Sequence, residues 1–136
     1  MMTFNLSRLA LLAGLVVAMF GFVTALQAAG ANELDKPVME YASDDLDTCA
    51  LGQVMGLKAD GDGFLSVRSG PGSNYTKLDE LQNGDKVWLF GREGKWIGIV
   101  YGVGELSCSP ISEDRVVPHD GKKGWVHENW IEIIAG

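Results

Sequence analysis

From Cys49 onward, the sequence breaks into short apolar runs separated by turns that contain glycine. Three of these turns are Asp60-Gly61-Asp62-Gly63, Asn83-Gly84-Asp85 and Arg92-Glu93-Gly94-Lys95. No helical period is sustained between them, and the runs recur at intervals of about ten residues, a spacing typical of antiparallel β-proteins. We therefore expect an all-β domain of about five or six short strands, which so short a chain closes more readily into a small barrel than into a sandwich.

Alternating side chains define the expected strands. In the run 86–90, Val87 and Leu89 point to one side, and Trp88 and Phe90 point to the other. In the run 96–101, Ile97 and Ile99 lie opposite Trp96, Gly98 and Val100 in the same way. Residues 53–59 and 64–68 are the first two expected strands, 77–81 is a further short run, and the runs 124–126 and 130–134 end the domain, whereas residues 102–123 are loop-like.

Residues 1–31 have the pattern of an export signal. Arg8 provides a short positive region, Leu9 to Leu26 is an uncharged apolar run, and Ala29-Gly30-Ala31 offers a small-residue cleavage site, although cleavage after Ala28 is also possible. The alternative is a retained membrane anchor, because a spanning helix needs about 20 apolar residues. We expect the protein to be periplasmic or secreted.

Export determines how the two cysteines are interpreted. An even number of cysteines in an oxidising compartment favours a disulfide, here Cys49–Cys108. The alternative is a nucleophilic cysteine assisted by His119 or His127, but no residue near either cysteine supports that chemistry.

The chain is acidic. Its net charge is −7, and without residues 1–31 it is −8, because Arg8 is the only ionisable side chain before Glu33. Nucleic acid is therefore not an expected partner, since it requires a basic face. Residues 32–52 form an acidic leader, in which Asp44-Asp45-Asp47 is interpreted as a solvated stretch rather than a metal cluster.

No pattern for a metal, a cofactor or catalysis is present in the sequence. Asp60-x-Asp62-Gly63 is similar to the start of a calcium loop, but the twelfth position is Pro71 instead of a glutamate. His119 and His127 lack the further ligands that a zinc site needs. There is neither a Gly-x-Ser-x-Gly elbow nor a phosphate-binding glycine loop.

Aromatic side chains are the remaining candidates for a binding site, because they bury a large area at low entropic cost. Tyr75 and Trp96 are the preferred ligand contacts, with Trp125 as a third aromatic candidate, and Arg68 and Asn74 can add hydrogen bonds at the same edge. For each aromatic residue, packing inside a small barrel is the competing interpretation.

The run Leu65 to Tyr75, which contains Ser69-Gly70-Pro71-Gly72, resembles the signature loop of bacterial SH3 domains. The resemblance continues through Gly84-Asp85, Trp96 and Gly124-Trp125-Val126, and it covers about residues 53–134. It implies a small, strongly bent SH3-like barrel of about five strands over residues 53–136. The stretch 102–123 is an insertion relative to the family, and a Cys49–Cys108 disulfide would tie it to the leader, so that the two together could cover one face of the barrel.

By resemblance, such domains are non-catalytic and bind cell-wall peptides or peptidoglycan, often to target an attached hydrolase. Only Ala135 and Gly136 follow the expected barrel, so we expect a stand-alone module that recognises a wall peptide or an envelope protein. We expect a monomer that needs no cofactor and associates with a membrane only if the N-terminal helix is retained. The alternatives are a structural or inhibitory protein whose groove is covered by the insertion, and a small cysteine-dependent enzyme.

Overall fold

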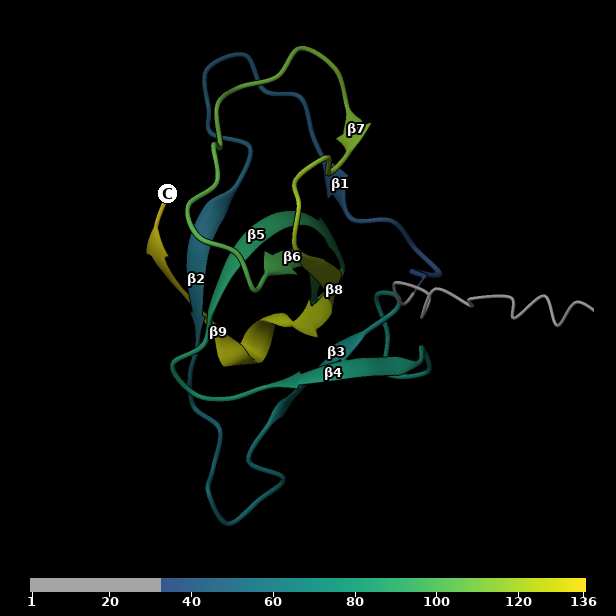
Figure 1. The fold of residues 1–136 in the computed structure, drawn as a ribbon, viewed down its shortest axis with the longest axis vertical. Helices are drawn as coiled ribbons and strands as arrows, with labels where there is room; N and C mark the ends of the chain where they lie inside the picture. Colours follow the sequence, from purple (N-terminus) through teal and green to yellow (C-terminus); the bar gives the residue numbers. More distant parts are fainter. Residues whose placement is uncertain (1–32) are drawn as a thin grey trace, which may run out of the picture.

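The computed structural model describes residues 33–136, which form a strongly bent seven-stranded antiparallel sheet and a small two-stranded sheet (Figure 1). The large sheet has the strand order β4-β3-β8-β6-β5-β2-β9, and the small sheet pairs β1 with β7. The elements are β1 (Met39–Glu40), β2 (Ala50–Val54), β3 (Leu65–Arg68), β4 (Lys77–Leu81), β5 (Lys86–Glu93), β6 (Trp96–Tyr101), β7 (Arg115–Val116), β8 (Lys122–His127), the 3₁₀ turn η1 (Glu128–Trp130) and β9 (Ile131–Ala135). The predicted all-β fold is confirmed. The expected export signal lies outside the described residues, and none of the helices within 33–136 has the length and apolarity to cross a membrane.

The strand expected over 53–59 is wrong in its bounds, because β2 begins at Ala50 and ends at Val54. Gly52 makes the earlier start possible: a Cβ at this position would lie 2.9 Å from Leu89 Cδ1 and 3.0 Å from Ile131 Cγ2. Only a glycine therefore lets β2 lie closely between β5 and β9. Gly56, with φ +80°, turns the chain away directly after the strand.

Two further expectations need correction. Arg92 and Glu93 belong to β5 rather than to the turn, which tightens around Gly94 at φ +59°. Residues 102–123 are not loop throughout, because they contain β7 and the first residues of β8, and Trp130 lies in η1 instead of the last strand.

The concave side of the sheet encloses the barrel core. As the alternation predicts, Val87 and Leu89 of β5 meet Ile97 and Ile99 of β6 there. The other buried members are Val54, Leu65, Val67, Leu81, Tyr101 and Val126.

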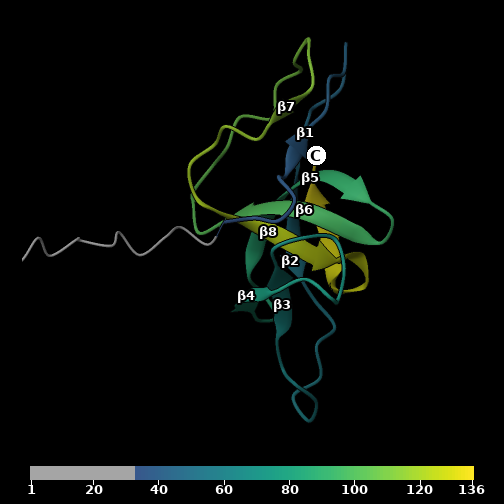
Figure 2. The ribbon, with the colours of Figure 1, turned by 90° about the vertical axis from the view of Figure 1, so that its right-hand side faces the viewer.

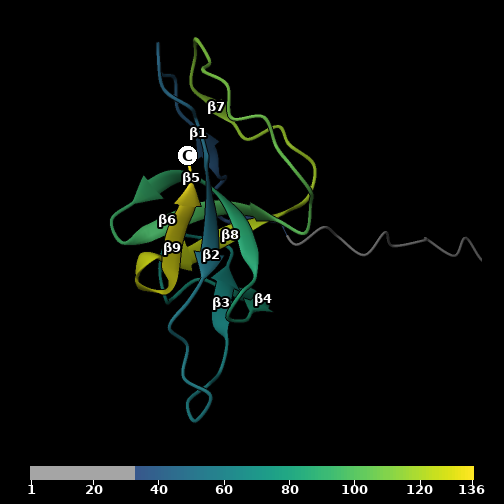
Figure 3. The same cartoon turned by 90° about the vertical axis from the view of Figure 1, so that its left-hand side faces the viewer.

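A second apolar core lies on the other side of the same strands. Residues 33–49 and 102–121 pack over β5, β6 and β8, and we call these two segments together the cover. Figures 2 and 3 show them running side by side away from one end of the barrel. From the sheet, Phe90, Val100 and Trp125 enter this second core, and from the cover, Val38 and Val117 meet them. The cover thus supplies the apolar environment that the outward-facing side of β5 needs.

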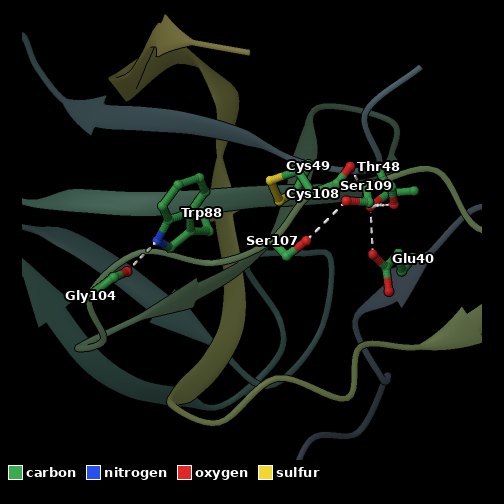
Figure 4. Close-up of a disulfide and its surroundings, with 8 residues drawn as sticks. All are labelled: Glu40, Thr48, Cys49, Trp88, Gly104, Ser107, Cys108 and Ser109. Atoms are coloured by element: carbon green, nitrogen blue, oxygen red, sulfur yellow. Dashed lines mark hydrogen bonds between the residues drawn. A yellow bond between two sulfur atoms is a disulfide. The ribbon is translucent and has the colours of Figure 1, made fainter. Parts of the chain in front are cut away.

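The cover is fastened to itself and to the barrel. Figure 4 shows the disulfide between Cys49 and Cys108, which joins the two segments of the cover where they reach the sheet. Beside it, Trp88 Nε1 donates a hydrogen bond to the Gly104 carbonyl at 2.9 Å. The predicted disulfide is confirmed, and neither cysteine of the chain has a free thiol.

Glu40 is a buried carboxylate inside the cover. Thr48 Oγ1 donates to its Oε1 at 2.5 Å, and Arg115 Nε donates to its Oε2 at 2.7 Å. Burial opposes ionisation, but these hydrogen bonds and the Arg115 charge outweigh it and hold the pKa of Glu40 below its ordinary value. The ion pair ties β1 to β7, the two strands of the small sheet.

Two glycines give the leader room to approach the sheet. A Cβ on Gly98 of β6 would lie 2.6 Å from Val38 Cγ1, and a Cβ on Gly91 of β5 would lie 2.8 Å from the Met39 carbonyl oxygen. The sheet therefore presents no side chain at the two positions where the leader crosses it, and larger residues there would displace the cover.

Candidate functional site

A cleft of about 460 Å³ opens at the end of the molecule that lies away from the cover. Its walls are the loop 55–64, which extends downward in Figure 1, strand β3, and the region where β6, β8 and η1 meet. Among the described residues that line it, none belongs to the insertion 102–123. The cleft is therefore not covered by the insertion.

Aromatic rings form much of the cleft surface. Trp96 opens β6 and lies edge-on to the His127 ring, with centroids 5.4 Å apart and an interplanar angle of 78°. Trp130 remains 37% exposed at the end of η1. Phe64 contributes a fourth ring, with Lys77 Nζ 4.5 Å from its centroid. These rings offer flat apolar surface whose edges stay in contact with water.

The turn η1 holds Trp130 in place through backbone hydrogen bonds. Met55 N donates to the Trp130 carbonyl at 2.9 Å, and Glu128 N donates to the Lys95 carbonyl at 2.9 Å. The Glu128 side chain accepts from Arg92 Nη1 at 2.7 Å. The cleft wall is thus fixed both to the end of β2 and to the β5–β6 turn, so the site is largely preformed.

Arg68 is the principal cation of the cleft. Its Nη1 donates to the Tyr75 carbonyl at 2.9 Å, which fixes the side chain between β3 and the glycine-rich loop. A guanidinium has five N–H donors, so most of them remain for a ligand. With Lys58 and one carboxylate, Asp62, the lining carries more positive than negative charge.

Asn74 and Tyr75, two of the expected ligand contacts, do not line the cleft, whose contribution from that loop is Ser73. The Tyr75 ring instead lies against Gly70 and Gly72, where it leaves no room for a Cβ on Gly70. Tyr75 thus closes the glycine-rich loop on itself. Of the five expected binding residues, Arg68 and Trp96 are the two that the structure brings together in this cleft.

Trp125 has no surface to offer a ligand, contrary to our expectation. It is 1% exposed, lies in the second core, and donates from Nε1 to the Lys36 carbonyl at 2.9 Å. The Gly124-Trp125 pair has a packing role: Trp125 fills the space under the leader, and Gly124 leaves room for Val67.

Sequence reasoning did not select the other three rings of the cleft, which are Phe64, His127 and Trp130. A usable signal existed for Trp130, because the polar pair Glu128-Asn129 interrupts two apolar runs and so predicts a break in the strand at that point. His127 and Phe64 have no comparable local signal. Across residues 33–136, no group of three or more His, Cys, Asp or Glu side chains lies close enough to hold a metal ion.

Comparison with known protein families identifies the family of the chain. The profile of the family described as bacterial SH3 domain matches residues 63–132, slightly more than half of the chain. This range includes β3 to η1 and most of the cleft. No curated protein and no solved structure matches the chain significantly.

Proposed function

This chain belongs to the bacterial SH3 domain family, and from that premise we propose that it is a binding module of the cell envelope whose aromatic cleft takes a peptide of the cell wall. The observation that carries the proposal is the cleft between loop 55–64 and η1, where Trp96 and Trp130 lie beside Arg68. We propose an exported location with it, because a wall ligand lies outside the cytoplasm and the N-terminal sequence pattern favours export.

The cleft suits a short peptide that ends in, or carries, a carboxylate. Aromatic rings bury the apolar parts of a peptide, and the unused guanidinium donors of Arg68 can bind a carboxylate in a bidentate manner. Lys58 adds positive charge at the same wall. A wall peptide combines these features, since it has small apolar side chains and free carboxylates.

The acidity of the chain does not oppose this ligand, because the negative charge lies elsewhere. Residues 50–101 and 122–136 contain equal numbers of acidic and basic side chains. The whole excess of −8 is therefore in residues 33–49 and 102–121, the two segments of the cover. An anionic peptide would approach a neutral barrel with a locally positive cleft.

A cysteine-dependent reaction finds no support in this structure. The thiolate is the reactive form of cysteine, and both cysteines of the chain are joined in the disulfide. The family match supports a binding module, and the proposal assigns the cleft to recognition alone.

The experiment is sedimentation of the purified, oxidised protein with insoluble peptidoglycan at low and physiological salt. The test variant is Trp130→Ala, because this side chain is exposed in the cleft and lies outside both cores. Tyr41→Ala is the matched control, since Tyr41 is an aromatic residue of similar exposure, 45%, on the cover.

We expect retention that persists at physiological salt and an affinity loss of about tenfold or more in Trp130→Ala, as for a central aromatic contact. Tyr41→Ala should bind like the wild type. Retention that disappears at physiological salt, or an equal loss in both variants, would overturn the assignment of the cleft.

A further inference from the structure

A second groove, of about 570 Å³, lies at the base of the cover and shares no lining residue with the aromatic cleft. Its floor is formed by Leu89 and Ile97, where the barrel core ends. One wall is the descending part of the leader, residues 45–49, and the other is strand β9 with Ile133. Figure 3 shows β9 and β2 side by side, with the cover rising beyond them.

Exposed apolar side chains stand on both walls of this groove. Leu46 is 71% exposed on the leader, and Ile133 is 61% exposed on β9. The backbone of Leu46 is held by a hydrogen bond, which its N donates to Ser43 Oγ at 3.1 Å. Two aliphatic side chains held apart above an apolar floor offer paired anchor points for a partner.

The leader wall is strongly acidic. Asp45 and Asp47 flank Leu46, and none of the four ion pairs formed among residues 33–136 includes either carboxylate. Arg92 also lines the groove, but its guanidinium is already paired with Glu128 at 2.7 Å. The free charge at the groove is therefore negative, and it belongs to the cover, which carries the whole net charge of the domain.

The strand beside the groove has a free edge. β9 is the last strand of the seven-stranded sheet and pairs with β2 on one side only. An unpaired edge can accept an extended segment through main-chain hydrogen bonds. A segment lying along β9 would turn every second side chain toward the groove floor. The side chains between them start from the other face of the sheet, from which long and flexible ones, such as those of Lys and Arg, can turn back to the carboxylates of the leader.

We propose that this groove is a docking site for an extended segment of a basic protein, one in which Lys or Arg side chains alternate with aliphatic ones. Aliphatic side chains would pack on Leu46, Ile133 and the floor, while basic side chains would pair with Asp45 and Asp47. Charge complementarity selects this occupant. A second copy of the chain would bring another cover with an excess of −8 against the same acidic wall, and like charges oppose that contact.

The test uses synthetic peptides of about nine residues, the length of a strand that spans the groove. The probe alternates Lys with Val, and the two comparison peptides alternate Glu with Val and Lys with Ser. Binding to the oxidised protein is measured by calorimetry at low and physiological salt, and the site is mapped by NMR shifts. Asp45→Asn/Asp47→Asn removes the acidic wall, and Ile133→Thr removes an apolar anchor.

Each variant has a matched control. Asp60→Asn/Asp120→Asn changes the net charge equally at two exposed carboxylates that line neither the groove nor the aromatic cleft. Ile134→Thr makes the same exchange at the next residue of β9, which faces away from the groove. All four variants change side chains that are not buried.

We expect the Lys–Val peptide to bind most strongly, with a loss of about tenfold in Asp45→Asn/Asp47→Asn and about fivefold in Ile133→Thr. The controls should change affinity less than about twofold. Equal losses in Asp60→Asn/Asp120→Asn, or equal binding of the Lys–Ser peptide, would reduce the effect to general charge attraction and overturn the proposal. Self-association that Ile133→Thr abolishes would assign the groove to a second copy instead, and would also overturn it.

Discussion

Removal of the disulfide by Cys49→Ala/Cys108→Ala should cost a large part of the stability. The bond closes a loop with a sequence separation of 59 residues. For a loop of that length, the chain-entropy treatment gives about 4 kcal/mol at 25 °C. A domain of this size has a free energy of unfolding of about 5–15 kcal/mol, so the variant loses a large share of it. Alanine avoids placing a hydroxyl next to the second core, where Cys49 is buried.

The loss should fall first on the cover. Both cysteines belong to it, and Val38 and Val117 hold it to the sheet from outside the barrel core. Urea denaturation followed by tryptophan fluorescence measures the change in midpoint, and hydrogen exchange measures where protection is lost. The amides of Val38 and Val117 should exchange faster, while those of Ile97 and Ile99 should keep more of their protection.

Reduction of the wild type should reproduce the behaviour of the variant, and reductant should leave the variant itself unchanged. A loss below about 1 kcal/mol would refute the reasoning, because it would mean that the loop is already restrained in the unfolded chain. Equal loss of protection in both cores would show that the cover does not open separately from the barrel.

Three further predictions test the contacts of the cover. Gly98→Ala should lower stability by about 1–3 kcal/mol in urea denaturation, because its Cβ would lie 2.6 Å from Val38, whereas Gly104→Ala, with open space around it, should change little. The lowered pKa of Glu40 contributes stability that is present above the ordinary pKa of a glutamate, about 4.3, and that is lost as the pH falls through the folded-state value. Glu40→Gln should therefore make the melting temperature depend less on pH between about pH 5 and pH 3. An unchanged slope of melting temperature against pH would contradict the role of this carboxylate. Trp125→Phe should lower the free energy of unfolding by about 1–3 kcal/mol, since it removes part of a buried indole from the second core together with its hydrogen bond to the Lys36 carbonyl. Peptidoglycan sedimentation should be unaffected, and a binding loss at unchanged stability would show instead that Trp125 contacts the ligand.

The strands that could be predicted from the sequence are those bounded by turn chemistry. Strands β4 and β6 lie at the predicted residues, because Asn83-Gly84 and Gly94 fix where each neighbouring turn occurs. β2 was misplaced because its limits depend on tertiary contacts: Gly52 weakens the local β pattern but is required by the approach of β5 and β9. β7 has only two residues, and its partner β1 lies far away in the sequence, so no local pattern could indicate it.

The candidate site could be predicted only in part, for a related reason. Arg68 and Trp96 were found because each stands at the edge of a recognisable turn. Trp125 and Trp130 are the same residue type near the same chain end, yet one is buried and the other lines the cleft. What separates them is the leader, which crosses the sheet above Trp125, and its path over Gly98 cannot be read from either segment alone.

The position of β2 also sets the order in which the chain can fold. Hairpins β3–β4 and β5–β6 join neighbouring segments and can form as soon as they are synthesised. β2 precedes both hairpins, yet one of its two partners is β9, and the adjacent Cys49 must wait for Cys108. The second core takes Phe90, Val100 and Trp125 from β5, β6 and β8, so it requires these strands to be in place before it closes. We therefore expect the Cys49–Cys108 bond, which fastens the cover, to form on a sheet that is already in place rather than on an unfolded chain.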